Sequence, residues 1–153
     1  MGAHVLVEKP MADTVDDCEA MLAAARSACR TLGVNHSDLF DPVVEQALQA
    51  VRAGRIGEVV SVDIMRNSDY PAYAGGPLPG TVAQGSYPFR DLGVHGLYTL
   101  EAFLGRLAPP QVTYQASGRD PNLAFDEWQA VVVGQRGVGR LLLSWNARPM
   151  ENR

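Results

Sequence analysis

The sequence is short of several features, and each shortage excludes a class of protein. Its 153 residues hold two cysteines, three histidines and a net charge of −4. Because like charges form no block, we expect neither nucleic acid nor a membrane surface as a partner. No apolar run approaches the ~18 residues of a membrane-spanning helix, and no signal peptide is recognisable. These absences favour a cytoplasmic location.

The two cysteines, Cys18 and Cys29, are too far apart to form a disulfide. Both fall on a helix predicted over residues 14–32, where their spacing corresponds to about 16 Å, beyond disulfide reach. The same spacing is close to three helical turns, so we expect both as buried small hydrophobic residues in a reducing compartment, with a metal or redox pair as the alternative. The histidines lack the spacing of a preformed metal site, and no metal is expected.

Apolar periodicity predicts a parallel strand–helix–strand segment over residues 1–35. Val5–Val7 is a continuous apolar run, typical of a strand covered on both faces in a parallel sheet. The helix over 14–32 then begins at a capping box of Thr14 and Asp17 and ends at Gly33. A short strand near Val34 completes the segment.

Residues 36–153 are predicted to form an α+β part with a mostly antiparallel sheet, so the fold class is α/β. A helix is expected from Asp41-Pro42 to Gly54, a half-buried strand over 59–66, and a helix from about Arg90 to Leu104. Strands in "QVTYQAS", "EWQAVVVG" and "VGRLLLSWNAR" follow as a meander. The change of pattern near residue 35 is the expected domain boundary.

One predicted helix carries an acid and a base that suit catalysis. In "FRDLGVHGLYTLEAFLG", Asp91 and His95 are four residues apart and therefore share a helix face. A carboxylate beside an imidazole fixes its tautomer and strengthens it as a general base near neutral pH. The alternative is a hydrogen bond that only stabilises the helix.

A second candidate is Lys9, which follows the first strand. The carboxyl ends of strands in open α/β sheets are where ligands bind, and a lysine there is a strong hydrogen-bond donor. The alternative is a lysine that extends from the strand end into solvent.

Together these motifs resemble the Gfo/Idh/MocA oxidoreductases, the family of glucose–fructose oxidoreductase and inositol dehydrogenase. The specific parts are "EKP" at residues 8–10 and "DLGVH" at residues 91–95, supported by the phrase "RAGRIGEV". The resemblance covers nearly the whole chain in the family's order. It implies an NAD- or NADP-dependent enzyme that oxidises or reduces a hydroxyl or carbonyl of a sugar, cyclitol or related compound.

The resemblance also implies roles for individual residues. Lys9 is expected to hydrogen-bond the reacting oxygen, His95 to act as general acid/base, and Asp91 to orient it or share a proton with it. Glu8, Lys9 and Pro10 are expected beside the nicotinamide, with a cis peptide bond between Lys9 and Pro10.

Two departures from the family pattern qualify these expectations. Where many members have a further acid three residues after the histidine, this chain has Tyr98, which either lines the pocket or packs in the core. The Gly-x-Gly-x-x-Gly turn is missing, since "GQRGVG" at 134–139 is interpreted as a hairpin. We therefore expect a fragment that lacks most of the Rossmann domain, is truncated at both ends and binds NAD(P) poorly by itself, exposing Val5, Leu6, Val7 and the stripe of Cys18, Met21 and Cys29.

The resemblance implies that the chain divides into two domains. Residues 1–35 are expected to be the last strand–helix–strand of a dinucleotide-binding domain, and residues 36–153 an incomplete substrate and oligomerisation domain. A homo-oligomer through the C-terminal sheet is expected. The long loop over 67–88 either offers aromatic surface to a sugar ring or packs on itself through Tyr70, Tyr73 and Tyr87. The alternative function is a non-catalytic carbohydrate-binding or oligomerisation module derived from the family.

Overall fold

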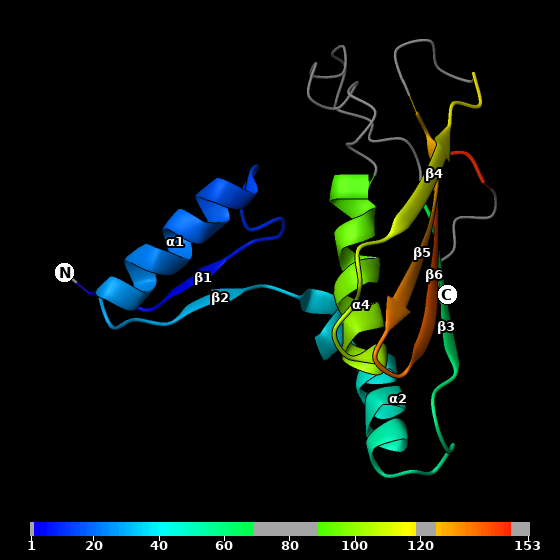
Figure 1. Ribbon diagram of the computed structural model, residues 1–153, viewed down its shortest axis with the longest axis horizontal. Helices are drawn as coiled ribbons and strands as arrows, with labels where there is room; N and C mark the ends of the chain where they lie inside the picture. Colours follow the sequence, from blue (N-terminus) through cyan, green and yellow to red (C-terminus); the bar gives the residue numbers. More distant parts are fainter. Residues whose placement is uncertain (1, 69–88, 119–124, 148–153) are drawn as a thin grey trace.

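The computed structural model describes residues 2–68, 89–118 and 125–147 (Figure 1). The tyrosines considered for the long loop, Tyr70, Tyr73 and Tyr87, lie outside these residues. The described elements are β1 (Val5–Val7), α1 (Val15–Ser27), β2 (Leu32–Val34), α2 (Pro42–Arg52), β3 (Ser61–Asn67), α4 (Val94–Leu104), β4 (Gln111–Gln115), β5 (Glu127–Gly134) and β6 (Gly137–Ser144). A short 3-10 helix over Ser37–Phe40 precedes α2, and a π-helical turn over Phe89–Gly93 precedes α4.

The N-terminal unit consists of β1, α1 and β2. The two strands pair in parallel, with Val5 opposite Leu32, as the apolar run predicted. α1 begins at the predicted cap: the Thr14 Oγ accepts from the Asp17 amide at 3.1 Å, and its hydroxyl donates to the Asp17 carboxylate at 2.6 Å. These reciprocal bonds satisfy a donor that the first helical turn leaves free.

The end of this helix was predicted wrongly. α1 stops at Ser27, because the chain reverses at Cys29, whose φ of 50° lies in the left-handed region, and Gly33 then belongs to β2. The cysteines therefore do not share a helix. Cys18 is half-buried on α1 and Cys29 is exposed in the turn, so neither is a buried core residue, and Cys29 is exposed as expected of a fragment; both are free thiols.

The second sheet has the strand order β3-β6-β5-β4 (Figure 1). The meander was predicted correctly, since β4 pairs with β5 and β5 with β6 in antiparallel fashion. β3 adds a parallel pairing with β6, from Ser61 opposite Val138 to Asn67 opposite Ser144. The sheet is thus mostly antiparallel, with one parallel edge.

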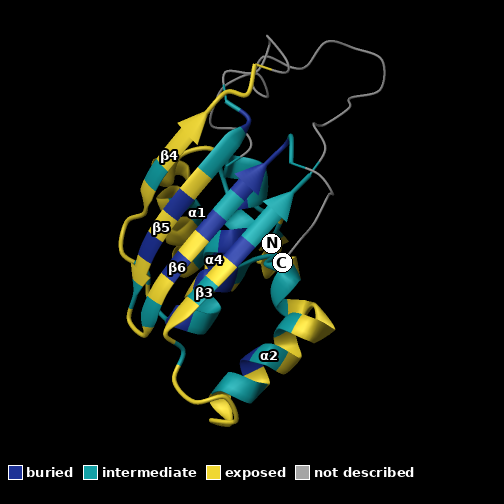
Figure 2. Cartoon of the chain, turned by 90° about the vertical axis from the view of Figure 1, so that its right-hand side faces the viewer, coloured by how far each residue is buried: buried dark blue, intermediate teal, exposed yellow. Residues whose placement is uncertain are grey.

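α4 covers one face of this sheet, and the core lies between them. Leu100 and Leu104 of α4 are 0% exposed and pack with inward-facing residues of the central strands, among them Leu141 and Leu143. The helix lies close to β6 because Gly96 has no side chain: a Cβ there would be 2.4 Å from Cδ1 of Leu141. Along β5 and β6, buried residues mostly alternate with exposed or half-buried ones, as in strands that have one face against a core (Figure 2).

α2 begins as the sequence predicted. Asp41 is the N-cap and accepts from the Val43 amide at 2.8 Å, while Pro42 occupies the first turn, where a missing N–H costs nothing. None of the helices in the described parts of the chain combines the length and apolar character needed to cross a membrane.

Candidate active site

The candidate site lies where the end of β1 meets the turn before α4. Lys9 follows β1, and its ammonium donates to Oδ1 of Asp91 at 2.9 Å and to the Asp91 main-chain oxygen at 3.0 Å. Nearby, Arg90 forms an ion pair with Asp13. The Lys9–Pro10 peptide bond is cis, as expected. Two predicted site residues that are distant in sequence are therefore in direct contact.

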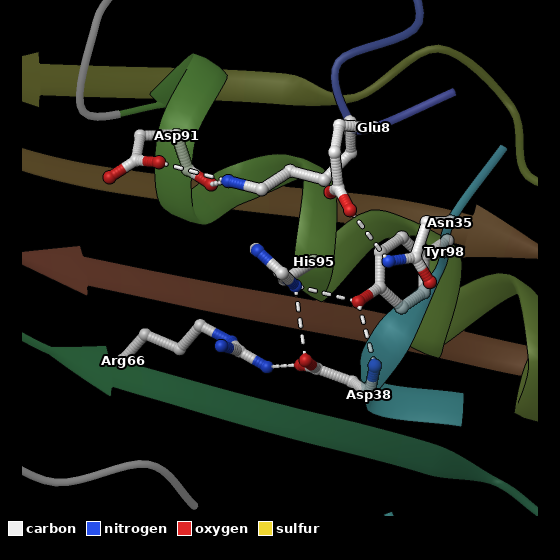
Figure 3. Close-up of polar contacts among 8 residues, drawn as sticks. Glu8, Asn35, Asp38, Arg66, Asp91, His95 and Tyr98 are labelled. Carbon is white, nitrogen blue, oxygen red and sulfur yellow. Dashed lines mark hydrogen bonds and ion pairs between the residues drawn. The ribbon is translucent and has the colours of Figure 1, made fainter. Parts of the chain in front are cut away.

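His95 lies in the first turn of α4, and its side chain is only 15% exposed. Its Nδ1 is 3.0 Å from Oδ1 of Asp38 and 2.6 Å from the hydroxyl oxygen of Tyr98 (Figure 3). No hydrogen bond joins it to Asp91, although both residues are described. The four-residue rule assumes a continuous α-helix, whereas Asp91 lies in the wider π-helical turn. The predicted neighbour of the imidazole thus faces Lys9 instead.

Asp38 and Arg66 are site residues that the sequence reasoning missed. Asp38 belongs to the 3-10 helix after β2, and its carboxylate forms an ion pair with Arg66 of β3 (Figure 3). The sequence holds a signal for Arg66: it continues the inward-facing alternation of Val62 and Ile64, so a charge occupies a position that would otherwise be apolar. Such a charge is expected to have a buried partner.

The sequence left open whether Tyr98 lines the site or packs in the core. In the structure it does both. It is 6% exposed, and its ring stacks on His36 with centroids 4.3 Å apart. Its hydroxyl oxygen accepts from the main-chain N–H of Asp38 at 3.1 Å while contacting His95. Tyr98 therefore connects the 3-10 helix to the imidazole.

The electrostatic surroundings keep the imidazole neutral. Burial, helped by the positive charges of Lys9 and Arg66, lowers the pKa of His95 to about 4, against the opposing effect of the carboxylates of Asp91 and Glu8. Burial also raises the pKa of Tyr98, although its bond with Ser37 and the charge of Arg66 act in the other direction. At neutral pH the ring is unprotonated and able to accept a proton.

The residues at the end of β1 could hold part of a cofactor. Glu8, Lys9 and Pro10 follow the strand at the shared carboxyl edge of β1 and β2, and the carboxylate of Glu8 accepts from the Asn35 amide at 2.8 Å. The sequence offers no glycine-rich turn for the pyrophosphate, since "GQRGVG" forms the β5–β6 hairpin. In the described residues, no group of three or more His, Cys, Asp or Glu side chains is placed to hold a metal ion.

Two family models match the chain. Residues 1–36 match "Oxidoreductase family, NAD-binding Rossmann fold", and residues 44–153 match "GFO/IDH/MocA C-terminal domain". Between them, these models cover almost every residue.

Individual proteins agree with these matches. The chain is 34% identical over 104 residues to 1,5-anhydro-D-fructose reductase of Ensifer adhaerens, covering 67% of this chain and 31% of the reductase. An NAD binding oxidoreductase from Klebsiella pneumoniae superposes with a TM-score of 0.82 at 24% identity, covering 95% of this chain and 42% of that one. An inositol dehydrogenase homolog from Azotobacter vinelandii, solved with NADH and myo-inositol, gives 0.76 at 24% identity, covering 99% and 40%. This chain spans 17% to 37% of the length of five curated relatives.

Proposed function

The chain belongs to the Gfo/Idh/MocA oxidoreductase family, and from this premise we propose that it carries the substrate-side half of an NAD- or NADP-dependent oxidoreductase. The reaction is hydride transfer between a nicotinamide and a hydroxyl or carbonyl carbon of a sugar, cyclitol or related compound. The names of the relatives support this class: one reduces an anhydrosugar, and another was solved with NADH and myo-inositol.

The observation that carries the proposal is the contact between Lys9 and Asp91 beside His95. The three residues come from different elements, and Lys9 and Asp91 are both close enough to influence the pKa of His95. A division into residues 1–35 and 36–153 belongs to the same proposal, and it is supported by the two separate sheets. The site then lies where the two domains meet.

The chemistry assigns one task to each side chain. A nicotinamide held beside Glu8, Lys9 and Pro10 would supply the acceptor for the hydride that leaves the carbinol carbon. His95 takes the hydroxyl proton, whose bonding electrons stay on oxygen and form the carbonyl. Lys9 donates a hydrogen bond to that oxygen as its charge develops, and Asp91 holds the ammonium in place. In the reverse direction His95 returns the proton.

The pairing of charges favours an uncharged substrate. In the described part of the site each cation already has a carboxylate: Lys9 faces Asp91, and Arg66 faces Asp38. An anionic substrate would have to displace one of these carboxylates, which a neutral polyol or ketose does not require. Turnover should therefore be greater with neutral polyols than with the corresponding sugar acids.

The test uses the protein encoded by the whole reading frame that contains this sequence, assayed by nicotinamide absorbance with neutral polyols and ketoses. His95→Ala and Lys9→Ala should each lower turnover by about 10²–10⁴-fold with little change in cofactor affinity. Arg140→Gln is the matched control, because Arg140 is exposed and pairs only with Asp63 among the described residues. Wild-type turnover in either site variant would refute the catalytic role of the residue it replaces.

A second candidate function, assembly through the sheet, is favoured by a sheet face that no described helix covers. Val131 and Val133 of β5 and Val138 of β6 are exposed there, opposite the face that α4 covers. We propose that a second copy covers this face. Val133→Lys should then shift the sedimentation profile toward the monomer, while Gln129→Lys on the same strand should have a smaller effect. A wild-type chain that sediments as a monomer would exclude this assembly.

A further inference from the structure

We propose that Asp38, held by Arg66, is the positioning residue that fixes the tautomer of His95 and leaves Nε2 as the nitrogen that exchanges a proton with substrate. This inference rests on the proposed function for its catalytic meaning. The tautomer itself can be tested without any turnover.

One hydrogen lies between His95 and Asp38. The carboxylate of Asp38 is ion-paired with Arg66 and so can only accept hydrogen bonds. Its Oδ1 is 3.0 Å from Nδ1 of His95, a hydrogen-bonding distance. The hydrogen must therefore be on Nδ1, because otherwise a nitrogen lone pair would face a carboxylate oxygen in a largely buried site.

Tyr98 does not by itself determine the tautomer of His95. Its hydroxyl oxygen is 2.6 Å from Nδ1 and already accepts the Asp38 amide at 3.1 Å. The contact with Nδ1 can be made in either direction: the phenol donates to a bare nitrogen, or it accepts from an N–H. With hydrogen on Nδ1, the N–H is shared between the Asp38 carboxylate and the Tyr98 oxygen, and no lone pair of the ring faces the carboxylate.

The other ring nitrogen of His95, Nε2, is left to exchange a proton with substrate. With Nδ1 protonated in the neutral ring, Nε2 holds a lone pair. In Figure 3 this second nitrogen points away from Asp38 and Tyr98, toward the side of the site where Asp91 lies. When Nε2 takes up a proton, the ring becomes a cation, and the carboxylate of Asp38 stabilises it through the Nδ1–H bond. Asp38 thus orients the base and stabilises its protonated form.

Arg66 makes Asp38→Asn an informative substitution. The guanidinium faces Oδ2 of Asp38, so an amide at this position is expected to turn its oxygen toward Arg66 and its NH₂ group toward His95. Nδ1 must then accept, and the hydrogen moves to Nε2. The single variant should therefore reverse the tautomer, and the double variant Asp38→Asn/Arg66→Met should restore it, because the amide is then free to turn.

The experiment is nitrogen-15 NMR of the histidine side chains in the 153-residue chain at neutral pH. The wild type should show a pyrrole-type Nδ1 and a pyridine-type Nε2 for His95, and Asp38→Asn should exchange the two. Tyr98→Phe should leave the pattern unchanged. Asp63→Asn removes the same charge from an exposed pair and is the matched control.

The wild-type spectrum alone shows whether the hydrogen of neutral His95 is on Nδ1. The proposal can therefore be tested even if a variant does not fold. A pyridine-type Nδ1 in the wild type would overturn it, as would an unchanged pattern in a folded Asp38→Asn chain. In the complete enzyme, Asp38→Asn should lower turnover by roughly 10²–10⁴-fold with little change in KM. If the tautomer is as described and the enzyme shows no dehydrogenase activity, the proposed function fails and the tautomer assignment stands.

Discussion

The two ends of the chain differ in how much of their own surface they bury. α4 and its sheet enclose a core in which Leu100, Leu104, Leu141 and Leu143 are at most 1% exposed. In the N-terminal unit, α1 has no buried residue, and Leu6 of β1 is 72% exposed. Both regions form regular elements with correct caps and pairing. Local signals are thus sufficient to form helices and strands, whereas burial depends on what packs against them.

The largest expected loss of stability comes from a substitution in the core between α4 and its sheet. Leu100→Ala should lower the free energy of unfolding by about 2–5 kcal/mol, because a fully buried leucine leaves a cavity between α4 and the sheet. Leu6→Ala, the matched change on exposed β1, should cost less than about 0.5 kcal/mol. Urea denaturation followed by circular dichroism measures both. Equal losses would mean that the two regions share one core.

Gly96→Ala should have the next largest effect. The added methyl group would lie 2.4 Å from Cδ1 of Leu141, so α4 must move away from β6. Overpacking of this kind typically costs about 1–3 kcal/mol, and the better helix propensity of alanine offsets only part of it. The control is Gly57→Ala, where nothing lies close to the added atom and the cost is only the backbone strain of a φ of 76°. If the Gly96→Ala chain were more stable than the wild type, the close approach of α4 to β6 would be contradicted.

Acid should lower the free energy of unfolding through the protonation of His95. The folded-state pKa of about 4 lies below the ordinary 6.5, so the unfolded chain binds more protons between these values. The contribution to stability is complete above pH 6.5 and declines as the pH falls toward 4. Between about pH 7 and pH 4.5, the urea midpoint of the wild type should decrease more than that of His95→Gln. Parallel decreases would show that His95 titrates normally in the folded chain.

The smallest expected change in stability comes from the Lys9–Asp91 ion pair, which joins the two regions. Asp91→Asn removes the ion pair with Lys9, but Lys9 keeps its bond to the Asp91 main-chain oxygen, and both side chains are partly exposed. The change in unfolding free energy should be under about 1 kcal/mol. Hydrogen exchange should nevertheless become faster in β1 and remain unchanged in β6. A loss above about 2 kcal/mol would mean that this contact stabilises the whole chain.

What the sequence predicted well was local. The cap of α1 at Thr14, the cap of α2 at Asp41 and the β4–β5–β6 meander are determined by neighbouring residues, and each was found where expected. The end of α1 was missed because a non-glycine residue, Cys29, adopts the left-handed conformation there. No spacing rule anticipates that choice.

What the sequence did not predict depends on partners that are distant along the chain. The parallel pairing of β3 with β6 has no local signal, and neither has the position of Asp38 beside His95. The motif around His95 drew attention to the imidazole, while the assumption of a regular helix gave it Asp91 as a neighbour. The three-dimensional structure assigns that place to Asp38 and Tyr98.

The position of β6 in its sheet has a consequence for synthesis on the ribosome. β6 comes last among the described strands and yet binds both β3 and β5. β3, α4 and β5 therefore leave the exit tunnel before β6 does, and their apolar faces stay exposed to solvent until β6 emerges. Long-range pairing of this kind slows folding and prolongs the exposure of unpaired edges. Nascent chains that pause before β6 should be held by chaperones, and the sheet should form only when this strand emerges.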